Sequence, residues 1–242
     1  MDEFSSGHNW VSLFSGGKDS SYALYLALQH DLNVERILTI LPTEESYMYH
    51  VPAIDLAELA AESIGIEYQP IDTTDLSLSG DSTVQGDTEI QPLETALREL
   101  TTESPDIKGV IAGAVESEFQ ANRIESMCSR LNFELFSPLW QRDPYALATD
   151  MIDAGFDIRI VQVAAAGLDQ SWLGRQLDQD TLQDLKALNE KYGVHPLGEG
   201  GEFETIVVDG PHMSKRIELE YEKKWENMRG ELVITDATLT ER

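Results

Sequence analysis

The amino-acid sequence predicts an α/β fold, in which a parallel sheet with helices on both faces is followed by a smaller α+β domain. An apolar run over 10–14 leads into two glycines and then into apolar residues at helical spacing, as expected for a strand, a turn and a helix. Strand and helix patterns then alternate through the first half of the chain, which favours a parallel sheet. Because the pattern changes near Ser137, we expect one domain over 1–137 and a second over 138–242.

The first domain is expected to alternate short strands with amphipathic helices. After the first strand and helix, strands are predicted over 34–41, 66–71, 110–112 and 133–136, and helices over 52–64, 92–100 and 121–131. Residues 73–91 are rich in Ser, Gly, Asp and Thr and contain no Lys or Arg, so we expect a mobile loop there. Ligands of a parallel sheet bind beyond the carboxyl ends of its strands, where the two glycines after the first strand fall.

The second domain is expected to be partly antiparallel. Helices are predicted over 144–154 and 182–192, and strands over 158–164, 203–208, 215–226 and 231–239. Ile217, Leu219 and Tyr221 alternate with charged residues, as they would in an antiparallel strand with one face in solvent.

The composition indicates a folded and strongly acidic protein. Hydrophobic residues make up 41% of the 242 positions, enough for a core, and 44 acidic against 17 basic residues give a net charge of −27. This charge disfavours binding of nucleic acid, which depends on Lys and Arg at the phosphates. A basic partner is one interpretation of the acidity. We favour a surface adapted to high salt, as in a halophilic archaeon, because the acidic residues are spread over the whole chain.

The sequence shows no sign of disulfides or of membrane insertion. Cys128 is the single cysteine, so an internal disulfide is excluded, and its place on an apolar helix face predicts packing in the core. Residues 1–9 are polar, and no apolar run has the length of a membrane span. We therefore expect a cytoplasmic protein without membrane contact.

The turn after the first strand carries the groups that phosphate binding requires. It consists of Ser15, Gly16, Gly17, Lys18, Asp19 and Ser20. The glycines leave the backbone accessible, and the amides at the start of the next helix attract an anion. Lys18 offers a cation to phosphate and Asp19 a carboxylate to a metal ion, and Asp19 and Ser20 are also placed as N-terminal helix caps. The alternative for any Gly-Gly turn is a tight connection without a ligand. The pattern here is neither G-x-x-x-x-G-K-[ST] nor G-x-G-x-x-G.

A second glycine-rich motif, G-E-G-G-E-F-E-T over 198–205, brings three glutamates together. If a strand begins at Phe203, then Glu202 and Glu204 point to the same face of it. Grouped carboxylates, with Glu199 as the third, repel one another unless a cation lies between them. We therefore favour a site for ammonium or Mg²⁺ over a plain turn.

Two further segments have open interpretations. Tyr47, Tyr49 and His50 follow the second predicted strand, and they either pack on the core or form a wall of the ligand pocket. Glu116 and Glu118 lie between a strand end and a helix start. They either favour the helix dipole there or contact substrate or metal.

These motifs also carry a resemblance to known proteins. The hexapeptide S-G-G-K-D-S resembles the S-G-G-x-D-S loop of the N-type ATP pyrophosphatases. With it, three other stretches resemble the diphthine–ammonia ligase (diphthamide synthase) family, in the same order along the chain: S-Y-M-Y-H over 46–50, E-S-E-F-Q over 116–120 leading to S-P-L-W over 137–140, and G-E-G-G-E-F-E-T over 198–205. The family usually has Asp-Tyr-Gln-Arg where this chain has Glu-Phe-Gln-Ala over 118–121.

The resemblance implies a Rossmann-like (HUP-type) nucleotide-binding domain and a smaller C-terminal substrate domain. It implies that ATP and Mg²⁺ are bound and that diphthine on elongation factor 2 is amidated with ammonium. The reaction would pass through an acyl-adenylate and release AMP and pyrophosphate. Free ammonium is the expected nitrogen source, because nothing in the chain resembles a glutaminase domain. The oligomeric state stays open, a homo-oligomer included.

Residue roles follow from the same resemblance. The hexapeptide would bind the phosphates of ATP, with Lys18 as their charge partner and Asp19 as a ligand of Mg²⁺. Catalysis would involve Lys18, Asp19, Glu199, Glu202 and Glu204. Substrate would contact Tyr47, Tyr49, His50, Glu116, Glu118, Gly200 and Gly201. The alternatives are another enzyme of the pyrophosphatase type that modifies tRNA, and an ATP-binding module without catalysis.

Overall fold

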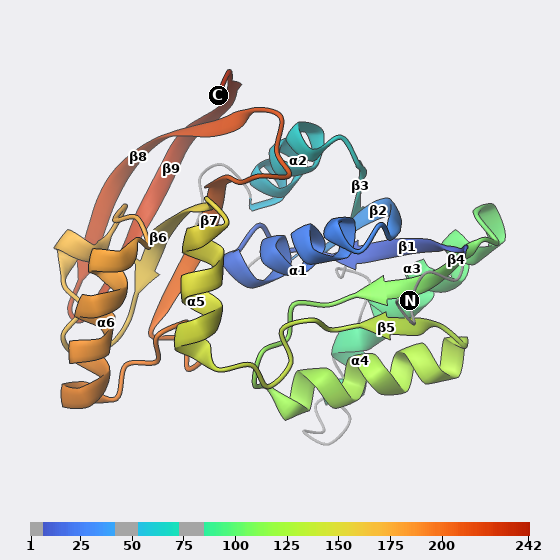
Figure 1. The fold of residues 1–242 in the computed structure, drawn as a ribbon, viewed down its shortest axis with the longest axis horizontal. Coiled ribbons are helices and arrows are strands. Elements are labelled where there is room, and N and C mark those ends of the chain that lie inside the picture. Colours follow the sequence, from blue (N-terminus) through green and yellow to red (C-terminus); the bar gives the residue numbers. More distant parts are fainter. Residues whose placement is uncertain (1–6, 42–52, 73–84) are drawn as a thin grey trace.

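Two sheets organise the chain. The computed structural model describes residues 7–41, 53–72 and 85–242, so Tyr47, Tyr49 and His50 lie outside the described residues. One sheet has five strands and the other has four, and they lie side by side with the helices around them (Figure 1).

The first sheet is parallel, with strand order β3-β2-β1-β4-β5. Its strands are β1 (Asn9–Leu13), β2 (Asn33–Ile40), β3 (Glu67–Ile71), β4 (Ile107–Ile111) and β5 (Glu134–Phe136). Successive side chains of β1 point to opposite faces, so that Trp10 joins one hydrophobic cluster and Val11 the other.

Helices cover both faces of this sheet. On the Trp10 face lie α1 (Lys18–Gln29) and α2 (Ala53–Ile64), and on the Val11 face lie α3 (Gln85–Glu103) and α4 (Glu118–Leu131). The predicted α/β class with a Rossmann-like parallel sheet is confirmed. Cys128 of α4 is buried, as predicted, and burial raises the pKa of its thiol to about 12.

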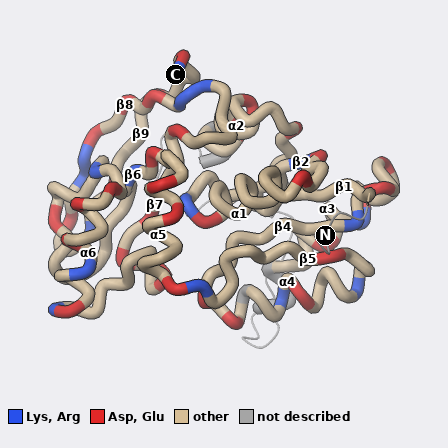
Figure 2. The backbone as a smooth tube through the Cα atoms, in the orientation of Figure 1, with Lys and Arg blue, Asp and Glu red and all other residues tan. Residues whose placement is uncertain are grey.

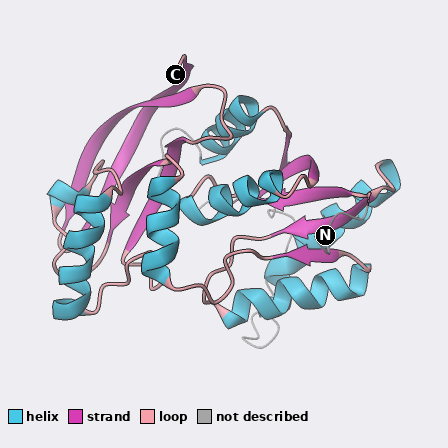
Figure 3. Cartoon of the chain, in the orientation of Figure 1, coloured by secondary structure: helices cyan, strands magenta, loops and turns pink. Residues whose placement is uncertain are grey.

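The second sheet is antiparallel, with strand order β7-β6-β9-β8. Its strands are β6 (Asp157–Val163), β7 (Phe203–Asp209), β8 (Arg216–Glu226) and β9 (Arg229–Thr240). The helices of this half are α5 (Pro144–Asp153) and α6 (Gln179–Tyr192), together with a short 3₁₀ turn over Gln170–Trp172 (Figure 3). The predicted α+β character of the second half is confirmed.

The predicted loop over 73–91 was wrong at its end, because α3 already begins at Gln85. The buried apolar residues of α3 start only at Ile90 and Leu93. Its first turn therefore carries no amphipathic pattern that could have predicted a helix.

The predicted capping of α1 was also wrong. Its N-cap is Gly17, with no side-chain cap, and Asp19 and Ser20 lie inside the first turn. The hydroxyl of Ser20 instead turns back into the loop, where it accepts a hydrogen bond from the amide of Ser15 and donates one to the carbonyl of Gly17.

The two sheets share a hydrophobic cluster. It contains Leu24 of α1 and Ile111 of β4 together with Ile160 of β6 and Val207 of β7. This continuous packing holds the sheets against each other, while the division into domains near Ser137 stays a proposal.

Acidic residues are scattered over both sheets and over the helices, with no separate acidic tail in the described chain (Figure 2). Across the described ranges, no helix has both the length and the hydrophobicity needed to cross a bilayer.

Candidate functional site

The candidate site is a cleft at the carboxyl ends of β1, β2 and β4. The chain passes from β1 to β2 on one side and returns to β4 on the other, so the cleft lies at the switch point of the parallel sheet. The volume of the cleft is about 400 Å³, and its lining includes Ser15, Asp19, Ser20, Thr39, Gly113 and Glu199. A second hollow, of about 450 Å³, lies at the β8–β9 turn. It is lined by different residues, and none of them belongs to the loop over 15–20.

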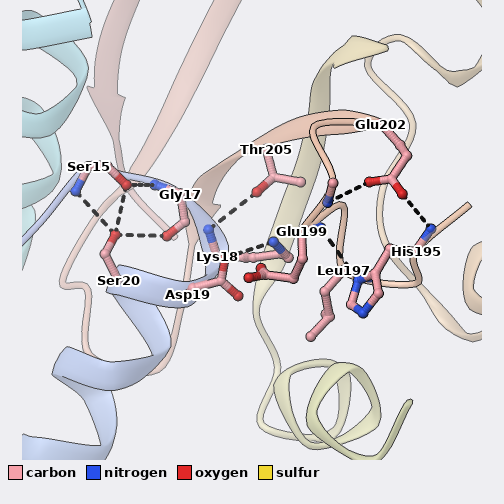
Figure 4. Close-up of polar contacts among 11 residues, drawn as sticks. Ser15, Gly17, Lys18, Asp19, Ser20, His195, Leu197, Glu199, Glu202 and Thr205 are labelled. Carbon is pink, nitrogen blue, oxygen red and sulfur yellow. Dashed lines mark hydrogen bonds and ion pairs between the residues drawn. The ribbon is translucent and has the colours of Figure 1, made fainter. Parts of the chain in front are cut away.

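The loop over 15–20 is held in shape by its own hydroxyls (Figure 4). The Oγ atoms of Ser15 and Ser20 are 3.2 Å apart, and the amide of Gly17 donates to Ser15 Oγ at 3.4 Å. Gly16 has a φ of +79°, a left-handed conformation that glycine adopts without strain. The amides at the start of α1, which have no acceptor within the helix, follow directly.

Lys18 and Asp19 form an ion pair beside this loop. Lys18 Nζ lies 2.7 Å from Asp19 Oδ2, and the two side chains are 6% and 24% exposed. The second oxygen, Asp19 Oδ1, is buried and has no hydrogen-bond partner within the described chain. A buried carboxylate oxygen without a partner is costly, so this atom suits a bound cation, and Mg²⁺ prefers oxygen ligands of this kind.

Two glutamates of the second motif lie next to this ion pair. The side chain of Glu199 reaches solvent on one side, but burial on its other side and the nearby Asp19 carboxylate raise its pKa to about 7. Burial also raises the pKa of Glu204, with Lys18 acting against the shift and Asp19 adding to it. Lys18 therefore offsets only part of the negative charge of these carboxylates.

Glu202, the remaining glutamate of this motif, binds backbone amides instead. Its carboxylate accepts hydrogen bonds from the amides of His195 and Gly200, both at 2.9 Å, so it fixes the loop before β7 (Figure 4). Gly200 lies in this loop, and Gly201 has a φ of +79°, which explains a glycine there.

His195 is a residue that sequence reasoning missed. Its Nδ1 accepts hydrogen bonds from the amides of Leu197, at 3.1 Å, and Glu199, at 3.4 Å. The proton of the neutral ring is therefore on Nε2, which faces Glu116 Oε2 at 3.5 Å. His195 thus connects the second motif to the segment between β4 and α4, but no pattern in the sequence marks it.

Gly113 is a second missed residue. A Cβ at this position would come within 2.7 Å of the Asp19 carbonyl carbon and within 2.8 Å of the Ser20 amide nitrogen. Only glycine lets the end of β4 approach the first turn of α1 this closely. The signal was available, because Gly113 directly follows a predicted strand.

The structure thus brings together predicted residues from three separate segments of the chain. Ser15, Asp19, Ser20 and Glu199 line one cleft, and Glu116 faces the motif through His195. Glu118 is instead the exposed first residue of α4 and is not part of the cleft lining, which favours its interpretation as a charge at the helix start.

Comparison with known proteins agrees with these motifs. Family models for the diphthamide synthase N-terminal and C-terminal domains match residues 8–135 and 143–240. A human protein named diphthine–ammonia ligase is 34% identical over 86% of this chain and 81% of its own length. Proteins of the same name in Schizosaccharomyces pombe and Saccharomyces cerevisiae are 33% and 35% identical, over 92% and 84% of this chain.

The yeast proteins are much longer than this chain, which spans 38% and 33% of their respective lengths. The animal relatives are matched over most of their length, and both family models are matched in chain order. The chain belongs to the diphthamide synthase family.

Proposed function

We propose that this protein is a diphthine–ammonia ligase, which uses ATP and ammonium to convert the carboxylate of diphthine on elongation factor 2 into an amide. The observation that carries the proposal is the meeting of two motifs in one cleft. The loop over 15–20, named here the phosphate loop, contributes Asp19 Oδ1, which has no partner in the described chain. The motif over 198–205, named here the acidic motif, contributes Glu199 beside it. Membership of the diphthamide synthase family supports diphthine as the substrate.

In the proposed reaction the carboxylate oxygen attacks the α-phosphorus of ATP, and pyrophosphate leaves. Ammonia then attacks the carbonyl carbon of the acyl-adenylate, and AMP leaves as the amide forms. The amides at the start of α1 and the Lys18 ammonium are placed to hold the phosphates and to stabilise the departing pyrophosphate. Asp19 would hold Mg²⁺, which adds positive charge at the phosphates.

The glutamates are assigned to the cationic reactants. Ammonium must lose a proton before its nitrogen can attack, and a base works best when its pKa lies near the working pH. Glu199, with its pKa near 7, suits this task. Glu204 would add negative charge that favours the trimethylammonium group of diphthine, while Glu202 keeps the loop in place.

The arrangement also supports separate tasks for the two halves, with nucleotide binding assigned to residues 1–137 and substrate binding to 138–242. A translation factor as acceptor supports a location in the cytoplasm. The charge of −27 speaks against tRNA as the acceptor.

The test is a complete reaction with ATP, Mg²⁺, ammonium and elongation factor 2 that carries diphthine. We expect AMP and pyrophosphate in equal amounts, together with the mass change that accompanies conversion of an acid into its amide. Release of ADP, or binding of ATP without any turnover, would contradict the proposal.

A further inference from the structure

The phosphate loop is attached to the second sheet through β7. This strand pairs with β6 along one edge only, since it ends the order β7-β6-β9-β8. On its other edge, the amide of Val207 donates a hydrogen bond of 2.9 Å to the carbonyl oxygen of Gly16. The loop therefore covers an edge that would otherwise expose unpaired backbone groups.

A side chain adds a second connection. Thr205 Oγ1 accepts a hydrogen bond of 3.3 Å from the amide of Lys18, the first residue of α1 (Figure 4). A Cβ on Gly17 would lie 3.4 Å from the carbonyl oxygen of Thr205, so the two backbones are nearly in contact. The hydroxyl thus takes one of the helix-start amides and fixes the direction in which the loop enters the helix.

We propose that Thr205 is a positioning residue for the phosphate loop, through which the second sheet sets the shape of the nucleotide site. The inference rests on the proposed function for its ligand, ATP. Without the hydroxyl, the loop would sample other arrangements, and ATP would have to order it on binding.

The experiment compares the wild-type protein with Thr205→Val, which keeps the shape without the hydroxyl, and Thr205→Ser, which keeps the hydroxyl. Thr238→Val, on the exposed part of β9, is the matched control. Binding is measured with α,β-methylene ATP and Mg²⁺. We expect Thr205→Val to weaken binding about 3- to 10-fold, as for the loss of one ordinary hydrogen bond, with Thr205→Ser and Thr238→Val within about twofold of wild type.

A second measurement does not depend on ATP. Hydrogen exchange of the amides over 16–18 should be faster in Thr205→Val than in the wild type, with an unchanged urea midpoint, and Thr205→Ser should restore protection. If exchange and affinity are the same in Thr205→Val as in the wild type, the positioning role is overturned. If exchange changes but even the wild-type protein does not bind the analogue, the proposed function fails while the positioning of the loop stands.

Discussion

Asp19 is the residue on which the proposed chemistry depends most. One of its carboxylate oxygens is paired with Lys18 and the other is buried without a partner in the described chain. Asp19→Asn keeps the shape and removes the charge that would hold a metal ion. Because a metal ion stabilises phosphoryl charge by several kcal/mol, we expect turnover to fall about 100-fold or more.

The matched control for this change is Asp180→Asn. Asp180 occupies the corresponding place in the first turn of α6, away from the cleft, so its substitution should leave turnover unchanged. Steady-state kinetics measure the turnover of both variants, and urea unfolding shows whether each of them is folded. Full activity in Asp19→Asn, or an unfolded protein, would count against the role given to Asp19.

Glu199 predicts a dependence of stability on pH. Its pKa is raised from 4.5 to about 7 in the folded protein, so the folded state binds the extra proton between these values. The contribution of Glu199 to stability therefore falls as pH rises from 4.5 to about 7. Glu199→Gln should be more stable than wild type at pH 8, and by a smaller margin at pH 5.

Urea unfolding at both pH values measures this effect. Glu218→Gln, on the exposed side of β8, gives the effect of removing one surface charge from the same sheet. The account of Glu199 is wrong if both variants shift the urea midpoint by the same amount at each pH.

At the scale of elements, the loop between α6 and β7 depends on Glu202. Its carboxylate accepts two backbone hydrogen bonds, from His195 and Gly200. Glu202→Ala should lower the free energy of unfolding by about 1–2 kcal/mol, since hydrogen bonds to charged groups are stronger than neutral ones but this carboxylate is partly exposed.

The measurement is urea unfolding combined with hydrogen exchange at the amides of His195 and Gly200. Glu220→Ala, on an exposed position of β8, should change neither quantity. Unchanged exchange in Glu202→Ala would show that the loop keeps its shape without these bonds.

The elements that could be predicted are those with local patterns. The apolar run of β1, the glycine turn and the amphipathic face of α1 gave a strand, a loop and a helix near their observed positions. The first turn of α3 could not be predicted, because its residues before Ile90 show no apolar spacing.

Likewise, the site residues that could be predicted are those that lie in local sequence motifs. Charged and glycine-rich motifs marked Asp19 and Glu199, whose chemistry is unusual for a turn. Thr205 and His195 acquire their importance only from contacts with residues far away in the sequence. Such contacts depend on how the sheets pack, which no local pattern records.

At the scale of the whole molecule, the two sheets are joined at several places. Beside the shared hydrophobic cluster, Ser63 of α2 donates from its hydroxyl to the carbonyl of Lys215 and accepts at its own carbonyl from the amide of Ser214. With the β7 contacts to the loop, these bonds fix the relative position of the motifs that form the cleft.

The net charge predicts a response to salt. A charge of −27 spread over the surface repels itself, and this repulsion opposes the compact state. Raising KCl from about 0.1 M to about 1 M shortens the screening length from about 10 Å to about 3 Å, so the unfolding temperature should rise. Scanning calorimetry tests this, with sucrose of equal osmolality as control. A temperature that stays constant with salt would contradict adaptation of the surface to high salt.

The central claim is that the loop over 15–20 binds the phosphates of ATP. A crystal structure with α,β-methylene ATP and Mg²⁺ tests it most directly. We predict the β- and γ-phosphates within hydrogen-bonding distance of the amides at the start of α1, with Lys18 and Asp19 beside them. A triphosphate bound elsewhere, with this loop making no contact to it, would contradict the account.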